Sequence, residues 1–152
     1  MDIKKLLLSL NDHKVCFVLI GAAAFPAHGY DRSTQDIDIF IKPTLANAKR
    51  TYRALESVGY DLQGLPEDHL LKKKVLLRQY ILDTDIHPFV KGVSFAEVWK
   101  NKVKSAWQGI PIFIASLPDL IKMKIAANRP KDLEDLRILR KILALQSAKT
   151  KT

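Results

Sequence analysis

Residues 15–41 read VCFVLIGAAAFPAHGYDRSTQDIDIFI, and this stretch decides the fold that the sequence predicts. An apolar run over 15–20 ends at Gly21, and a second apolar run over 36–41 carries two acidic residues. Small residues, then proline, glycine and polar residues, fill the space between the two runs, which favours a short helix followed by a loop. The pattern therefore predicts strand, glycine turn, short helix, loop and strand.

The second of these strands alternates acidic and apolar residues in the order Asp36, Ile37, Asp38, Ile39. Successive side chains of a strand point to opposite faces, so both carboxylates lie on one face and both isoleucines pack behind it. Adjacent carboxylates repel each other unless a cation lies between them, and Mg²⁺ takes carboxylate and phosphate oxygens as ligands. Gly21 would let an anion approach the backbone at a helix start. The alternative is an ordinary half-exposed strand beside a simple turn.

Taken together, these features resemble the signature of the nucleotidyltransferase superfamily with the DNA polymerase beta-like fold. That signature is a hydrophobic residue, Gly, then Gly or Ser, a gap, and Asp-hydrophobic-Asp/Glu, and it matches Ile20, Gly21, Ala22 and 36–38 here. Small bacterial members, including the abortive-infection and toxin types, have a His-Gly, Arg and Thr before the acidic pair, much as 28–35, HGYDRSTQ, does. Ala22 stands where the family has Gly or Ser, so a phosphate-binding hydroxyl is absent at this position.

A later segment offers a third carboxylate. The runs over 75–82 and 85–90 predict two strands joined by a tight turn at 83–84. Family members carry an acidic residue on such a later strand, and the resemblance gives this role to Asp85. Asp83 has the same parity and is the alternative, although its position next to Thr84 suits a turn.

His87 has the parity of Asp85 on the same expected strand. Two interpretations remain open for this side chain. It either contacts substrate or is a hydrogen-bonded structural histidine.

The C-terminal region predicts two helices, since Ser116 begins a capped helical segment and Pro130 divides that segment in two. Residues 119–136, DLIKMKIAANRPKDLEDL, resemble the C-terminal segment of the small bacterial nucleotidyltransferases. The matching positions are Lys124, Arg129, Lys131, Asp132 and Asp135. The resemblance implies nucleotide binding by Gly21, Ala22, Arg32, Thr34 and Lys124, with Arg129 and Asp132 in support. Asp132 would orient Lys124 through a charge-assisted hydrogen bond.

The expected fold is α/β (α+β), one domain over 1–152. It has a mixed sheet of about four or five strands, helices mainly on one face and a C-terminal helical pair. Further helices are expected over 2–10, 45–58 and 94–102, and a strand pair over 103–107 and 110–115. The basic tail from about 147 to 152 is expected to be disordered.

The composition fits one globular unit. The 152 residues are 47% hydrophobic, which is enough to bury a core without disulfides. The formal net charge of +9 favours a polyanionic partner, although solvated helix faces explain such a balance equally well. Cys16 is the only cysteine, so no disulfide forms within the chain. No apolar run reaches the ~20 residues that span a bilayer, and a cytoplasmic protein without membrane contact is expected.

The resemblance implies transfer of a nucleoside monophosphate from a nucleoside triphosphate, expected to be ATP, to an acceptor hydroxyl. Mg²⁺ or Mn²⁺ would be held by Asp36, Asp38 and Asp85, while Lys124 and Arg32 offset negative charge. The acceptor stays open among RNA (a tRNA end), a protein side chain and a small molecule, and a small helical partner protein is a candidate. The alternatives are a catalytically weakened protein acting as an RNA-binding module or toxin–antitoxin component, which Ala22 favours, and a metal-dependent phosphohydrolase.

Overall fold

The computed structural model describes residues 2–32 and 35–150. The first half contains α1 (Ile3–Asp12), β1 (Phe17–Ile20), the 3₁₀ turns η1 (Gly21–Ala24) and η2 (Pro26–His28), β2 (Asp36–Ile41), α2 (Leu45–Ser57) and α3 (His69–Lys72). The second half contains β3 (Val75–Leu77), β4 (Asp83–His87), α4 (Phe95–Lys100), β5 (Val103–Trp107), β6 (Ile110–Ile114), α5 (Leu117–Ala127), η3 (Pro130–Asp132) and α6 (Leu133–Thr150).

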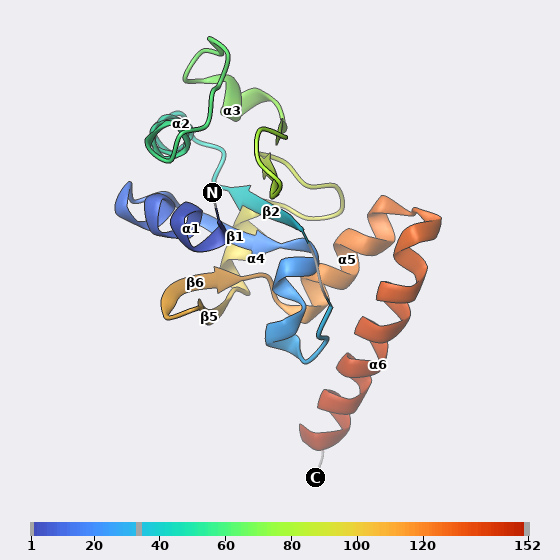
Figure 1. Ribbon diagram of the computed structural model, residues 1–152. Helices are drawn as coiled ribbons and strands as arrows, with labels where there is room; N and C mark the ends of the chain where they lie inside the picture. Colours follow the sequence, from blue (N-terminus) through green and yellow to red (C-terminus); the bar gives the residue numbers. More distant parts are fainter. Residues whose placement is uncertain (1, 33–34, 151–152) are drawn as a thin grey trace.

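The strands form one mixed sheet in the order β3-β4-β2-β1-β6-β5 (Figure 1). The pairs β1–β2, β3–β4 and β5–β6 are antiparallel, whereas β1–β6 and β2–β4 are parallel. The predicted α/β class with a mixed sheet is therefore confirmed. The sheet has six strands rather than four or five, because both late strand pairs join it.

The alternation in β2 separates a packed face from an open one. Ile37, Ile39 and Ile41 are fully buried, and α1 and α2 lie side by side over this part of the sheet (Figure 1). The Ser9 hydroxyl of α1 donates to the Ala54 carbonyl of α2 at 2.8 Å, which ties the two helices together. The carboxylates of β2 therefore point away from this helical layer.

The end of β2 that is remote from its carboxylates is closed by aromatic packing. Phe40 shares the face of the carboxylates and meets Phe95 of α4 edge to face, with ring centroids 5.1 Å apart. Ser94 caps α4 through the amide of Glu97, as the sequence predicts. The aromatic pair therefore covers the far end of the acidic face.

A buried amide that the sequence analysis did not identify fixes β1 beside β2. Asn47 accepts from the backbone amide of Cys16 at 2.7 Å and donates to the carbonyls of Cys16 and Lys42 at 2.9 and 3.0 Å. The side chain is fully buried, so these bonds satisfy backbone groups that water cannot reach. Thr44 caps the same helix, as predicted, through the amide of Asn47.

The prediction for residues 75–90 is partly wrong. β3 ends at Leu77, and residues 83–84 lie inside β4 rather than in a turn. Asp83 pairs with Asp36 and Thr84 with Ile37, because β4 runs parallel to β2 and gains its hydrogen bonds there. Thr84 is fully buried and its hydroxyl lies 2.8 Å from that of Tyr60, an environment that suits a β-branched strand residue.

The helical pair at the C-terminus is present as α5 and α6, which lie side by side (Figure 1). Ser116 caps α5, and the helix ends at Asn128, which has a φ of 49°. α6 continues to Thr150, four residues into the tail for which the sequence predicts disorder, because Ala and Lys favour helix. Across the residues that the structure describes, no helix combines the length and apolar character needed to cross a membrane.

Candidate active site

The parallel pairing of β2 with β4 brings four carboxylates onto one face of the sheet. Asp36 lies opposite Asp83 and Asp38 lies opposite Asp85 in the strand register. Register partners share a face, and so do residues two apart in one strand, so all four side chains leave the sheet on the side that α1 and α2 do not cover. Asp85 is therefore next to Asp38, the position that the sequence prediction needs for a third carboxylate.

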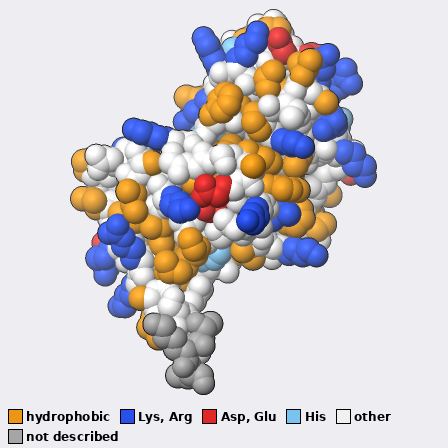
Figure 2. Space-filling model, turned by 180° about the vertical axis from the view of Figure 1, so that it is seen from behind, with side chains coloured by type: hydrophobic (Ala, Val, Ile, Leu, Met, Phe, Trp, Pro, Cys, Tyr) orange, Lys and Arg blue, Asp and Glu red, His pale blue; other side chains and the backbone are white. Residues whose placement is uncertain are grey.

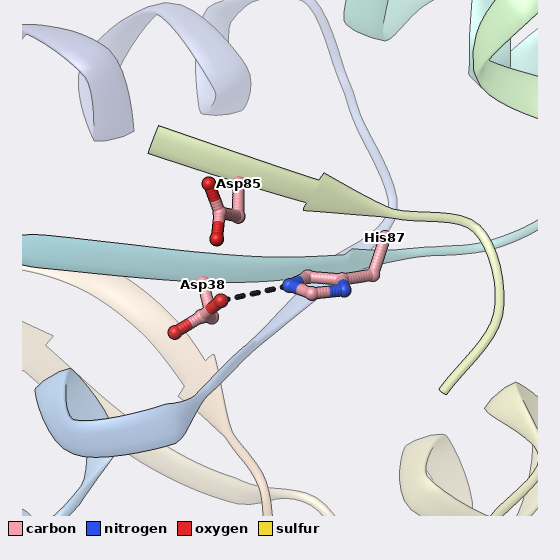
Figure 3. A group of neighbouring side chains, drawn as sticks. All are labelled: Asp38, Asp85 and His87. Carbon is pink, nitrogen blue, oxygen red and sulfur yellow. Dashed lines mark hydrogen bonds and ion pairs between the residues drawn. The ribbon is translucent and has the colours of Figure 1, made fainter. Parts of the chain in front are cut away.

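His87 completes a compact group with two of these carboxylates (Figure 3). Its Nε2 lies 2.8 Å from Oδ1 of Asp38, and Asp85 projects into the same space from β4 (Figure 3). One potential ligand atom from each of Asp38, Asp85 and His87 lies within 4.8 Å of the others. The three side chains are partly buried, so the group is held in place yet open to a ligand. Two carboxylates and an imidazole are a donor set that fits a divalent metal ion.

Gly21 lies directly against this group. Its φ is +69°, and a Cβ built on it would come within 2.5 Å of Oδ2 of Asp38. Any side chain at this position would therefore push the Asp38 carboxylate out of place. The close approach seen in the structure is that of the Asp38 carboxylate, and the anionic ligand expected at this backbone stays a prediction.

Asp36 lies at the outer end of the acidic face, beside Asp83. Asp36 is exposed, but partial loss of hydration raises the pKa of its carboxyl, and the neighbouring charges of Asp83 and Asp38 raise it further. A divalent cation at this face would relieve the repulsion among these groups. The compact group consists of Asp38, Asp85 and His87. Two of the three predicted metal ligands therefore lie together in it, while Asp36 lies beside Asp83.

Arg78 is a contact of the acidic face that the sequence analysis did not identify. Its guanidinium donates to Asp85 at 2.7 Å and lies 3.6 Å from Asp83. Arg78 lies in the middle of the strand expected over 75–82. Residue order alone does not show which side chains of a neighbouring strand it contacts. Its charge offsets part of the acidic cluster.

A second charged network connects the loop before β2 to the C-terminal helices. Lys124 binds Asp132 at 2.9 Å and Asp135 at 3.3 Å, and Arg129 donates to Asp132 at 2.7 Å. Arg32 donates to the same Asp135 at 2.6 Å. The contact between Asp132 and Lys124 is the one that the sequence predicts.

Asp135 is the centre of this network, although the sequence analysis gave it no role. Both of its oxygens are used, since Tyr30 also donates to it at 2.9 Å. Tyr30 was not identified either, and it stacks on the buried Phe25. Thr34, a predicted nucleotide contact, lies outside the described residues. Ala22, another predicted contact, is partly buried in η1.

The network predicts an acid-sensitive contribution to stability. Burial would raise the pKa of Asp132, but hydrogen bonds from Arg129 and Lys124 lower it from 3.8 to about 2. A lowered pKa means that the stabilisation is complete above pH ~4 and is lost as the pH falls toward 2, a contribution of about 2 kcal/mol. The unfolding free energy of the Asp132→Asn variant should therefore fall less between pH 5 and pH 2.5 than that of the wild type, as measured by urea titration.

The control for this experiment is Glu134→Gln, since Glu134 is exposed and forms its ion pair with Arg137 at the surface. Exposed pairs contribute little to stability, so this variant should follow the wild-type profile. Identical acid profiles for the wild type and Asp132→Asn would show that the network does not stabilise the fold.

The structure contains a cavity of about 380 Å³ that includes none of the four carboxylates. Its lining includes Asp2, Ile3 and Lys4 at the start of α1, together with Leu82. The cavity therefore lies on the side of α1, whereas the carboxylates face the other side of the sheet.

Figure 2 shows one face of the molecule with a small acidic group near its centre and Lys and Arg side chains on both sides of it.

A mixed sheet with carboxylates on adjacent strands and a glycine at the end of the neighbouring strand is the arrangement that the nucleotidyltransferase resemblance implies. The profile of the family described as "Nucleotidyltransferase of unknown function (DUF6036)" matches residues 1–145. The chain therefore belongs to this nucleotidyltransferase family, as the resemblance in its sequence indicated. Comparison with curated proteins finds no match.

Solved structures of nucleotidyltransferases share the fold. The lincosamide antibiotic adenylyltransferase LnuA has a TM-score of 0.65 at 18% identity, covering 93% of this chain and 98% of LnuA. The antibiotic-resistance factor ANT(2'')-Ia also gives 0.65, at 16% identity, over 98% of this chain and 89% of its own. A putative nucleotidyltransferase from Thermotoga maritima gives 0.60 at 18% identity, over 93% and 90%. At these identities the similarity establishes the common fold.

Proposed function

We propose that the protein transfers a nucleoside monophosphate from ATP to a hydroxyl group of an acceptor, with Asp36, Asp38 and Asp85 at the reacting centre. The observation that carries this proposal is the pairing of Asp38 with Asp85 on adjacent parallel strands, next to Gly21. Membership of the nucleotidyltransferase family supports the reaction class, and the positions of the carboxylates support their assignment to the reacting centre.

The donor set of the site fits a divalent cation, Mg²⁺ or Mn²⁺. A bound divalent ion neutralises phosphate charge and aligns the attacking and leaving oxygens of an in-line displacement. In that displacement the acceptor oxygen bonds to the α-phosphorus, the bond from phosphorus to the bridging oxygen breaks, and pyrophosphate leaves. Asp85 would accept the proton of the acceptor hydroxyl, a role supported by its partial burial and its position beside Asp38.

The remaining predicted residues would bind the triphosphate. Gly21 and Ala22 would offer backbone N–H groups, and the side chain of Arg32 is 42% exposed, so it can reach a phosphate without leaving the surface. Lys124 uses two carboxylate partners, which fix its position, and an ammonium group has a third donor. Arg129 and Asp132 would act by holding Lys124.

A small hydroxyl compound is the acceptor that the comparisons favour. LnuA is named a lincosamide antibiotic adenylyltransferase, and ANT(2'')-Ia was solved with adenylyl-2''-tobramycin. Those compounds belong to those proteins, and their chemistry is the basis for the acceptor proposed here. An RNA end or a protein side chain as acceptor would appear as another outcome of the same assay.

The test is incubation of the purified protein with Mg²⁺ or Mn²⁺ and each of four α-labelled nucleoside triphosphates. Separate reactions receive lincosamide and aminoglycoside compounds, total RNA and cell protein. Label from ATP should enter the small-molecule pool, and the label should be lost in Asp36→Asn. If no label enters any pool with either metal, the proposed reaction is wrong. Binding of RNA without turnover would then favour a binding module.

A further inference from the structure

We propose that His87 is a direct ligand of the metal ion, together with Asp38 and Asp85, and that the site therefore selects a first-row transition ion such as Mn²⁺ over Mg²⁺. This inference rests on the proposed function, since it concerns the ion of that same site. It adds an imidazole nitrogen to a ligand set that the sequence predicts to be made of carboxylates alone.

The first argument is the position of His87 in the strand. His87 follows Asp85 by two residues in β4, so both side chains leave the same face of the sheet. Its strand partner in β2 is Phe40, two residues after Asp38, so the imidazole must turn back along the sheet to reach the carboxylate. Figure 3 shows the ring directed at Asp38, with Asp85 above the same space.

The second argument is the spacing of the ligand atoms. Metal–ligand bonds of about 2.1 Å place neighbouring ligand atoms of one ion roughly 3 Å apart and opposite ones about 4.2 Å apart. Oδ1 of Asp38 and Nε2 of His87 are separated by 2.8 Å, and the atoms of the whole group lie within 4.8 Å. Only small adjustments would therefore centre these three side chains on one ion.

The third argument is how the neighbours of Asp38 and Asp85 hold the two carboxylates. The absence of a side chain at Gly21 lets Oδ2 of Asp38 lie against the backbone, where a Cβ would come within 2.5 Å, so the carboxylate is held with Oδ1 toward His87. Arg78 binds Asp85 at 2.7 Å and offsets its charge. The Asp38–His87 edge is thus the part of the cluster without that guanidinium contact among the described residues, and it is where an ion would enter.

A histidine with a purely structural role would need a proton on Nε2, which a metal ligand must lack. As a hydrogen-bond donor to Asp38, Nε2 carries a proton, whereas a metal ligand must present its lone pair. The two roles are therefore mutually exclusive in the metal-bound state. Imidazole favours transition ions, while Mg²⁺ favours oxygen ligands, so the two roles also predict different metal preferences.

The experiment loads the purified full chain with Mn²⁺ alone and records pulsed electron paramagnetic resonance. An imidazole ligand should produce ¹⁴N modulation in the Mn²⁺ signal of the wild type. His87→Gln should lose this modulation and bind Mn²⁺ about tenfold or more weakly, since loss of even an outer partner of a metal ligand costs 10- to 100-fold. The affinity of this variant for Mg²⁺, measured by calorimetry, should change much less. The ratio of its Mn²⁺ affinity to its Mg²⁺ affinity should therefore be about tenfold lower than in the wild type.

The matched control is His69→Gln, which removes a histidine from α3 and leaves the acidic face unchanged. This variant should retain the ¹⁴N modulation and both affinities. Mn²⁺ that binds the wild type without ¹⁴N modulation, or that does not bind at all, would overturn the inference, and neither result depends on how His87→Gln folds. Failure of the proposed function is separate, because it would appear as absent label transfer with either metal.

Discussion

The Asp38→Asn variant should lose nucleotidyl transfer by roughly 10³-fold while remaining folded, since a metal–phosphate contact contributes several kcal/mol to transition-state stabilisation. Asp38 lies at the centre of the site. It contacts His87 at 2.8 Å, neighbours Asp85 in the register and approaches Gly21. Asparagine has nearly the same shape, but it lacks the negative charge that holds a cation. The measurement is the initial rate of label transfer from α-labelled ATP to the acceptor found with the wild type.

Asp12→Asn is the control for this prediction, because Asp12 is an exposed residue at the end of α1. It should transfer label at the wild-type rate. Thermal unfolding of both variants separates loss of chemistry from loss of fold. A folded Asp38→Asn protein with undiminished transfer would exclude Asp38 from the reacting centre.

Gly21→Ala should have the second-largest effect and should reduce both stability and activity. The backbone at Gly21 has φ +69°, which costs a residue with a side chain about 1–2 kcal/mol. The new methyl group would also come within 2.5 Å of Oδ2 of Asp38. The carboxylate would have to move out of its group with His87, so transfer should fall at least 100-fold, as a misplaced catalytic group does.

Gly64→Ala distinguishes the two causes. Gly64 has nearly the same φ, +72°, but an added Cβ meets nothing within 4 Å. This variant should therefore lose a similar ~1 kcal/mol of stability from strain alone and keep full transfer activity. Equal activities for the two glycine variants would show that the contact between Gly21 and Asp38 has no functional importance.

The C-terminal helices are tied to the first half of the chain through the network around Asp135. Arg32 and Tyr30 precede β2, and both donate to Asp135 of α6. Lys124 of α5 binds the same carboxylate. The part of the chain around Tyr30 and Arg32 is therefore tied to α5 and α6, so these contacts join the two segments in which the sequence resembles the nucleotidyltransferases.

The sequence alone determined most of what is local. The two strands around Gly21, the caps Thr44, Ser94 and Ser116, and the shared face of Asp36 and Asp38 follow from residue type and period. These features depend on neighbours within a few residues, and so they can be read in order along the chain. The nucleotidyltransferase family could be recognised from the same residues.

The tertiary structure decided how these parts meet. Strand period assigns Asp85 and His87 to a face, but only the parallel pairing of β4 with β2 sets them beside Asp38. Because of the same pairing, Asp83 lies in a strand and not in the turn that the sequence predicts. Register, ion pairs and close approaches such as Gly21 to Asp38 join residues far apart in the chain, and no local period encodes which of them will be partners.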